Sequence, residues 1–168
     1  MAAPFDPICL FEILDHHEVN YVLIGALAGV LHGSSATTSD ADIVPATDTA
    51  NLERLSRALG DLGARIRSPS EPDGISFDPH PELLGSVTIL NLTTRCGDLD
   101  LTLTPSGLGG YDEIAPGAGV FDVDGLSVMV ASLDDIIRSK EAADRPRDRA
   151  TLPILHALRD EIDRNRRE

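Results

Sequence analysis

The spacing of apolar residues changes several times along the chain, and each change marks the boundary of a predicted element. Residues 21–24 form a short, largely apolar run, which is typical of a buried strand. Residues 51–62 carry apolar side chains at helical spacing instead, at Leu52, Leu55, Leu59 and Leu62. A helix is therefore expected there, with Thr49 or Asn51 as its N-terminal cap.

Shorter patterns predict the other elements. Further helices are expected over residues 8–17, over 26–32, from Ser132 with Asp135 at the capping-box position, and over about 147–164. Further strands are expected over residues 87–92, 99–103 and 126–130, and residues 94–98 predict a hairpin between the first two. Pro and Gly predict loops at residues 69–74 and 105–119, the second with one short turn.

Length and composition limit the architecture. With 168 residues, 42% of them hydrophobic, the chain can build one compact core. We expect a single domain over residues 1–168, with its core at about 19–131 and C-terminal helices at about 132–166. No apolar run is long enough to span a membrane and the N-terminus lacks the basic start of a secretory signal, so a soluble cytoplasmic protein is expected. Cys9 and Cys96 make neither a disulfide framework nor a zinc site and are interpreted as reduced.

The net charge of −14 is unevenly distributed along the chain. Residues 1–137 hold 21 acidic and 5 basic side chains, whereas residues 138–168 hold 7 acidic and 9 basic ones. The acidic body disfavours extended contact with a nucleic acid, since phosphate affinity comes from Lys and Arg. The basic C-terminal segment is either a solvated helix end or a contact for nucleic acid or triphosphate.

Two pairs of aspartates carry the strongest chemical signal. Asp40 and Asp42 begin one predicted strand, and Asp98 and Asp100 lie at the start of another. Side chains two residues apart in a strand point to the same face, so each pair presents its carboxylates together. Such carboxylates repel one another unless a cation lies between them, and hard oxygen ligands favour Mg²⁺ or Mn²⁺. We predict a metal site of Asp40, Asp42 and Asp100, with Asp98 as the alternative third ligand; for one pair alone, capping of a turn is the structural alternative.

The order of these motifs is similar to that in the DNA polymerase β-type nucleotidyltransferase superfamily. The shared features are Gly25-Ala26 after a strand, a short helix, Asp40-Ala41-Asp42 and a later Asp98-Leu99-Asp100. Residues 130–148 resemble small bacterial members related to the AbiEii/AbiGii toxin family. The resemblance covers about residues 19–158. It implies an α/β (α+β) fold with a mixed, mainly antiparallel sheet, flanking helices and a helical C-terminal portion.

The resemblance also implies the reaction. Asp40, Asp42 and Asp100 would hold two Mg²⁺ or Mn²⁺ ions for the transfer of a nucleoside monophosphate from a nucleoside triphosphate such as ATP. Lys140, the only lysine in the chain, would contact a triphosphate oxygen; its structural alternative is an i,i+4 ion pair with Asp144.

The remaining nucleotide-binding positions lie between the first strand and the aspartates. Gly25 and Ala26 would let the triphosphate approach the backbone N–H groups of the helix that follows, although close helix–strand packing also explains Gly25. Ala26 stands where the family usually has Gly or Ser, and Ser34 and Ser35 could supply the missing donor.

Two functions fit this sequence best, and a metal phosphohydrolase ranks behind them because the chain lacks the His-rich ligand set that many such sites use. The first is a Mg²⁺-dependent nucleotidyltransferase that modifies the 3′ end of tRNA or a protein side chain, as part of a toxin–antitoxin or phage-defence system. The second is a catalytically silent module that binds and neutralises a partner protein. Ala26 and the lack of any arginine between Gly25 and Asp40 favour the silent module, whereas the four aspartates favour the enzyme.

Overall fold

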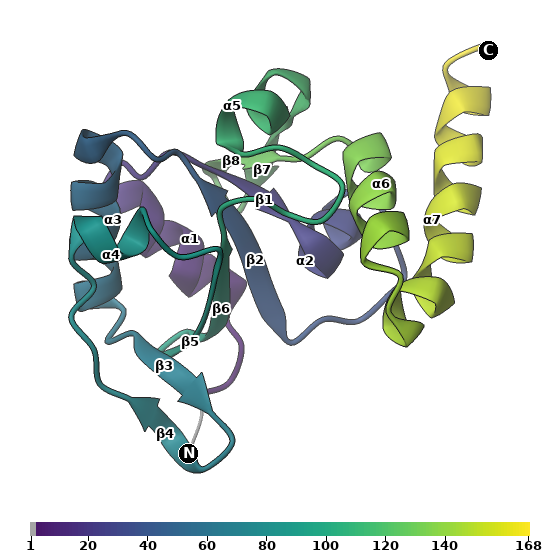
Figure 1. Cartoon of the computed structure of the whole chain (residues 1–168). Helices are drawn as coiled ribbons and strands as arrows, with labels where there is room; N and C mark the ends of the chain where they lie inside the picture. Colours follow the sequence, from purple (N-terminus) through teal and green to yellow (C-terminus); the bar gives the residue numbers. More distant parts are fainter. Residues whose placement is uncertain (1–2) are drawn as a thin grey trace.

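The computed structural model describes residues 3–168, in which an eight-stranded sheet forms the centre (Figure 1). The strand order is β4-β3-β5-β6-β2-β1-β8-β7. Neighbouring strands are antiparallel except for the parallel pairs β1–β8 and β2–β6. The strand bounds are β1 Tyr21–Ile24, β2 Asp40–Pro45, β3 Arg65–Ser68, β4 Glu71–Ile75, β5 Ile89–Thr94, β6 Gly97–Thr102, β7 Gly119–Val123 and β8 Leu126–Val130. The expected mixed, mainly antiparallel α/β architecture is confirmed.

The helices gather on two sides of the central strands. Figure 1 shows α1, α3 and α4 on one side and α2, α6 and α7 on the other. Their bounds are α1 Pro7–His16, α2 Gly25–Leu31, α3 Thr49–Asp61, α4 Pro81–Leu84, α5 Tyr111–Ile114, a 3₁₀ turn Ala115–Gly117, α6 Leu133–Ala143 and α7 Pro146–Asn165. Across residues 3–168, every helix is too short or too polar to cross a membrane.

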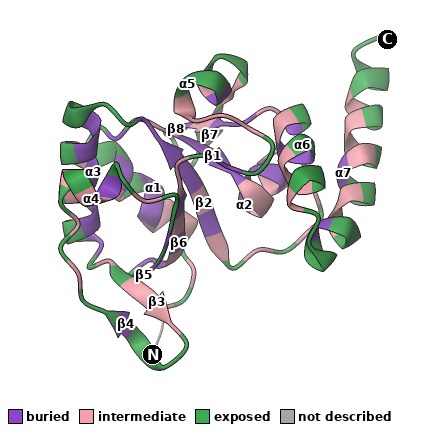
Figure 2. Cartoon of the chain, in the orientation of Figure 1, coloured by how far each residue is buried: buried purple, intermediate pink, exposed green. Residues whose placement is uncertain are grey.

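The core lies between the sheet and the inward sides of the helices. Buried positions follow β1 and β2 and the inner faces of α1 and α3, as Figure 2 shows. In α7, by contrast, only Asp148 and Leu155 are buried. The last helix therefore packs against the rest of the protein mainly through its N-terminal half.

The cap of α3 differs from the prediction. Asp48 caps the helix by accepting a hydrogen bond from the backbone N–H of Asn51, so the expected cap at Thr49 or Asn51 is wrong. The Asn51 side chain is fully buried and donates to the carbonyl oxygens of Asn20 and Ala46 instead. This residue connects α3 to the end of the β1–β2 pair at which β1 begins and β2 ends.

The loop predicted at residues 69–74 is also wrong, because Glu71–Ile75 forms strand β4 and pairs with β3. β4 is the edge strand of the sheet, where Pro72 is tolerated because no further strand needs its missing N–H group. Gly74 adopts a positive φ of 76° within this strand. At the opposite edge, strand β7 lies where no strand was predicted.

The predicted hairpin at residues 94–98 is confirmed as the β5–β6 turn. Within it, Thr94 Oγ1 donates to the carbonyl of Gly97. Cys96 in the turn forms a disulfide with Cys9 of α1, so the interpretation of two reduced cysteines is wrong. The segment before α1 crosses the turn, where the Asp6 N–H donates to the Cys96 carbonyl at 2.9 Å. This tertiary contact joins cysteines 87 residues apart, and no local pattern predicts it.

Candidate active site

Two adjacent strands bring the aspartate pairs together. β2 and β6 run parallel, with Asp40 opposite Asp98 and Asp42 opposite Asp100. Residues two apart in a strand share a face, so all four carboxylates lie on one face of the sheet. The two motifs, almost sixty residues apart in sequence, thus form one acidic cluster, as the D-x-D spacing predicted.

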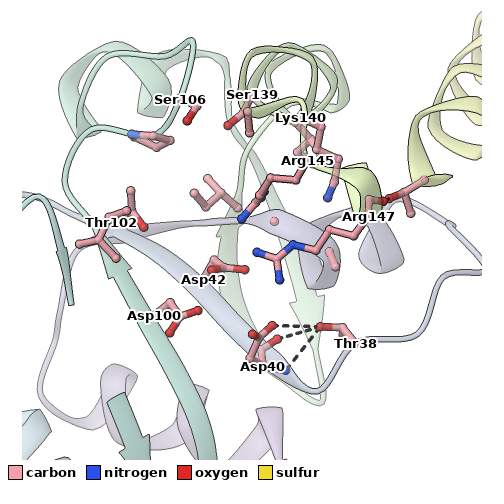
Figure 3. Close-up of a pocket in the computed structure, with 18 of the residues that line it drawn as sticks. Thr38, Asp40, Asp42, Asp100, Thr102, Ser106, Ser139, Lys140, Arg145 and Arg147 are labelled. Atoms are coloured by element: carbon pink, nitrogen blue, oxygen red, sulfur yellow. Dashed lines mark hydrogen bonds between the residues drawn. The ribbon is translucent and has the colours of Figure 1, made fainter. Parts of the chain in front are cut away.

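A cavity of about 940 Å³ opens above this cluster (Figure 3). Asp40, Asp42 and Asp100 line it, whereas Asp98, which the structure also describes, does not. Its walls come from the β1–α2 junction, the segment before β2, the β5–β6 strands with the segment that follows, and helices α6 and α7. The main polar residues of these walls are Thr37, Thr38, Ser39, Thr88, Thr102, Thr104, Ser106, Ser139, Lys140, Arg145, Arg147 and Thr151.

Gly25 lies directly against the carboxylate of Asp42. Its φ of 74° is in the left-handed region that favours glycine. A Cβ at this position would also collide with Asp42 Oδ2. Strand β1 pairs antiparallel with β2, with Ile24 opposite Asp42, which accounts for the close approach. Glycine is therefore required here by the backbone and by the neighbouring carboxylate.

The aspartates carry negative charge that the protein balances only in part. Burial raises the pKa of Asp42 to about 7, and the charges of Asp40 and Asp100 add to the effect, while Lys140 and Arg147 oppose it. Burial also raises the pKa of Asp100, against the opposing charge and hydrogen bond of Arg67. Burial and neighbouring like charges both favour the protonated form of a carboxyl group.

Three cations face the aspartates from the corner between α6 and α7 (Figure 3). Lys140 and Arg147 are near enough to lower the pKa of Asp42. Asp148, which is fully buried, accepts hydrogen bonds from Arg145 and lies 3.5 Å from Lys140 Nζ. Burial would raise the pKa of Asp148, but Arg145 and Lys140 hold it below the usual value. Lys140 pairs with this residue rather than with Asp144, whose partner is Arg149.

The other predicted nucleotide-binding residues divide into two groups. Gly25 and Ala26 line the cavity, but Ser34 and Ser35 are not among its described lining residues. Ser34 Oγ accepts from the Ala36 N–H within its own loop. The hydroxyl that lies at the aspartates belongs to Thr38, which donates to the Asp40 carbonyl at 3.0 Å and contacts Asp40 Oδ1 at 3.3 Å (Figure 3).

The arginine nearest to Asp100 was missed by the sequence analysis. Arg67 on β3 donates to Asp100 Oδ1 at 2.5 Å and lies 3.4 Å from Asp98. Its segment, Arg65-Ile66-Arg67-Ser68, has alternating polarity that could have identified a strand, but nothing in it indicates which aspartates it meets.

The donor set suits a hard divalent cation, because carboxylate oxygens are the ligands that Mg²⁺ and Mn²⁺ prefer. Across residues 3–168, however, no group of three His, Cys, Asp or Glu side chains has the geometry to hold an ion as it stands. Arg67 engages one oxygen of Asp100, and Thr38 contacts one of Asp40. An ion would therefore have to use the other oxygen of each carboxylate, or displace these contacts.

Solved structures of nucleotidyltransferases share this fold. The lincosamide antibiotic adenylyltransferase LnuA, solved with lincomycin bound, superposes with a TM-score of 0.58 and 17% identity, over 90% of this chain and 95% of its own. A putative nucleotidyltransferase from Thermotoga maritima gives a TM-score of 0.55 and 16% identity over 88% of both chains. The antibiotic-resistance factor ANT(2'')-Ia gives 0.54 and 12%, over 93% of this chain and 88% of its own. No protein-family model and no curated protein matches this chain. These likenesses confirm the fold that the motifs implied.

Proposed function

We propose that this protein is a metal-dependent nucleotidyltransferase, which moves a nucleoside monophosphate from a nucleoside triphosphate to a hydroxyl group. One observation carries the proposal: Asp40, Asp42 and Asp100 meet on one face of the sheet, opposite the cations Lys140 and Arg147, in a cavity large enough for a nucleotide. Clustered carboxylates facing cations suit a negatively charged substrate that arrives with divalent ions.

In the proposed reaction, the acceptor oxygen attacks the α-phosphorus of the triphosphate. A bond forms between these two atoms, the bond from the α-phosphorus to the bridging oxygen breaks, and pyrophosphate leaves with that electron pair. The hydroxyl proton passes to a carboxylate of the aspartate cluster. Lys140 and Arg147 would neutralise the charge that develops on the departing pyrophosphate.

Asp40, Asp42 and Asp100 are the residues that would hold the divalent ions. When bound, such ions neutralise triphosphate charge and lower the pKa of the attacking hydroxyl. Asp100 is preferred to Asp98 as the third ligand because it lines the cavity beside Asp42. Gly25 would keep the backbone clear of the Asp42 carboxylate, and Ala26 would leave phosphate contacts to backbone N–H groups.

Three classes of acceptor are proposed for this site. The family resemblance suggests the 3′ end of tRNA or a protein side chain, within a toxin–antitoxin or phage-defence system. LnuA was solved with lincomycin, and ANT(2'')-Ia with adenylyl-2''-tobramycin, so a small hydroxyl-bearing molecule joins these candidates. The net charge of −14 favours a protein or a cationic small molecule over RNA.

The proposal is tested by label transfer from each of four α-³²P nucleoside triphosphates in Mg²⁺. Acceptors are total tRNA, lysate protein, lincomycin and tobramycin, each with and without EDTA. The Asp40→Asn/Asp42→Asn protein should transfer nothing. Asp112→Asn, an exposed aspartate of α5 outside the cavity, should transfer normally and is the matched control. The labelled species identifies both nucleotide and acceptor class.

The silent binding module is the second candidate, favoured by Ala26 and by the lack of a ready metal site in residues 3–168. It predicts no label transfer from any triphosphate by protein that is demonstrably folded. It also predicts that a partner protein is retained equally well by the native chain and by the Asp40→Asn/Asp42→Asn variant in EDTA. Transfer that disappears in that variant would exclude it.

A further inference from the structure

Arg67 lies on β3, yet its guanidinium group reaches the two aspartates of β6, two strands away. Its Nη2 donates to Asp100 Oδ1 at 2.5 Å and to the Leu92 carbonyl at 3.1 Å. Its Nε lies 3.4 Å from Asp98 Oδ2, too far for a good hydrogen bond. Among the described residues, this Nε is the buried side-chain nitrogen or oxygen left without a hydrogen-bond partner. The guanidinium thus lies over β5 and joins β3 to both aspartates of β6.

A neighbouring arginine shows that this placement is not dictated by the strand. Arg65 lies two residues earlier on β3 and therefore on the same face. It donates instead to the carbonyls of Asp73 and Gly74 in the edge strand β4. Arg65 stabilises the outer hairpin, whereas Arg67 is turned the other way, toward Asp98 and Asp100 of β6.

The electrostatic surroundings of Asp100 explain why it needs a cation. Asp42 is directly opposite on β2, and Asp98 lies two residues away on the same face. Like charges at these positions drive a carboxylate toward solvent unless an opposite charge restrains it. The Asp100 side chain is only 15% exposed, and Arg67, at 34%, is partly shielded as well. The ion pair is therefore screened less than a surface pair.

We propose that Arg67 is a positioning residue that holds the Asp100 carboxylate beside Asp42 in the cavity, with Asp98 and the Leu92 carbonyl as its anchors. A rigid guanidinium fork suits this task because it fixes direction as well as charge. Arg67 uses Oδ1 of Asp100 and leaves Oδ2 for a ligand in the cavity. Asp98 and Asp100 thus have different roles, one as anchor and the other as metal ligand. The catalytic consequence of this inference rests on the proposed function.

The first test needs neither metal nor activity. Crystal structures of the native chain and of Arg67→Met, both grown in EDTA, compare the side-chain orientation of Asp100. We expect the carboxylate to leave the cavity in Arg67→Met and to stay in Arg65→Met, the matched control. An unchanged Asp100 in Arg67→Met would overturn the positioning role, whether or not the protein is an enzyme. Arg67→Gln, which removes the charge but keeps a polar side chain, answers the same question if Arg67→Met does not fold.

The second test measures Mn²⁺ binding by electron paramagnetic resonance, with a non-transferable α,β-methylene ATP present. Removing a group that orients a metal ligand costs about tenfold or more in affinity, so Arg67→Met should bind Mn²⁺ at least that much more weakly. Asp98→Asn should shift it in the same direction but less, and Arg65→Met should not shift it. Arg67→Lys should recover part of the loss.

Kinetics separate positioning from a general loss of structure. Arg67→Met should lower kcat while leaving KM for the triphosphate close to the native value, because Lys140 and Arg147 contact that substrate in the proposed site. Equal Mn²⁺ affinity in native and Arg67→Met proteins would overturn the inference. A native protein that binds no Mn²⁺ and transfers no nucleotide would instead contradict the proposed function, and the orientation of Asp100 in the crystals would still decide the role of Arg67.

Discussion

At the residue scale, the site depends on a glycine and an aspartate that occupy adjoining space. Gly25 has a positive φ, and a side chain there would displace the Asp42 carboxylate. Gly63, which follows α3, has a similar φ of 60° but no atom within 4 Å of an added Cβ. The two glycines therefore separate the backbone requirement from the requirement for space at the aspartate.

Gly25→Ala should abolish most of the activity, whereas Gly63→Ala should not. Both substitutions force alanine into the left-handed region, at about 1–2 kcal/mol of unfolding free energy each. Only Gly25→Ala also moves Asp42, and a misplaced group of this kind lowers kcat by about 10²-fold. Urea unfolding and single-turnover transfer measure the two effects. Equal activity in the two variants would contradict the role of Gly25.

Asp42 makes the stability of the metal-free protein depend on pH. Its pKa is raised from 3.8 to about 7, so the folded state binds this proton more tightly than the unfolded state. The stability contribution is complete below about pH 4 and is lost as pH rises to about 7 and above. Relative to Asp42→Asn, the native chain should lose at most about 4 kcal/mol of unfolding free energy between pH 4 and 8.

Urea unfolding in EDTA at several pH values checks this difference. Added Mn²⁺ should stabilise the native chain more at pH 8 than at pH 5, because the ion competes with the proton for Asp42. Asp42→Asn should show little of either effect. A difference between the two proteins that does not change with pH would contradict the assignment.

The arrangement of the site aspartates could be predicted from the sequence, because the spacing within each pair determines which face of the strand the carboxylates share. In a strand, D-x-D places both carboxylates on one face, and the later pair follows the same rule. Arg67 could not be predicted in the same way, since its partners are determined by the position of β3 beside β5. Ser34 and Ser35 illustrate the converse: they are close to Asp40 in sequence, yet Thr38 is the hydroxyl that contacts it.

At the element scale, the corner between α6 and α7 positions the three cations that line the cavity, Lys140, Arg145 and Arg147. Asp148 is fully buried and holds both Arg145 and Lys140, which come from opposite sides of the turn. Asp144 in the same corner forms a wholly different pair with Arg149, in which both side chains are 63% exposed. One corner thus contains a buried acidic anchor and an exposed ion pair.

Asp148→Asn should destabilise the fold and weaken nucleotide binding together. Leaving a buried cation without its partner costs about 3–5 kcal/mol, and because Arg145 is half exposed we expect about 2–3 kcal/mol here. KM for the triphosphate should rise several-fold as Lys140 loses its orientation. Asp144→Asn should change unfolding free energy by less than about 1 kcal/mol and leave KM unaltered. Thermal unfolding and initial rates distinguish the two, and matching results would contradict the anchor role.

Elements with strong local signals were predicted well, and those that depend on the sheet were not. Strand β1 and the Ser132 cap of α6 are as expected, because burial and capping are local patterns. β4 contains Pro72 and Gly74 and was predicted as a loop. It exists because β3 supplies its hydrogen-bonding partner and because an edge strand tolerates both residues. β7 likewise depends on β8.

At the scale of the whole molecule, the disulfide joins the first helix to the hairpin that leads into the site. Cys96 lies in the turn before β6, two residues from Asp98, and Cys9 lies in α1. The Cα atoms are 5.7 Å apart, within the usual range for a disulfide. The sequence, with two cysteines in 168 residues, did not predict this disulfide, because its formation depends on where α1 packs.

Reduction of this bond should lower stability more than it lowers activity. A crosslink between residues 87 apart restricts the unfolded chain, and removing such a link costs about 2–4 kcal/mol. The β5–β6 pairing and the β2–β6 register do not involve the cysteine side chains, so the aspartates should keep their arrangement in the folded fraction. Urea unfolding with and without a phosphine reductant measures the loss of stability, and transfer assays below the unfolding transition measure the activity.

The Cys9→Ala/Cys96→Ala protein is the control for reduction. It should resemble the reduced native chain and should not respond to reductant. Two results together would show that the Cys9–Cys96 disulfide does not form in solution: two reactive thiols in the untreated native protein, and urea unfolding curves that are the same with and without the reductant.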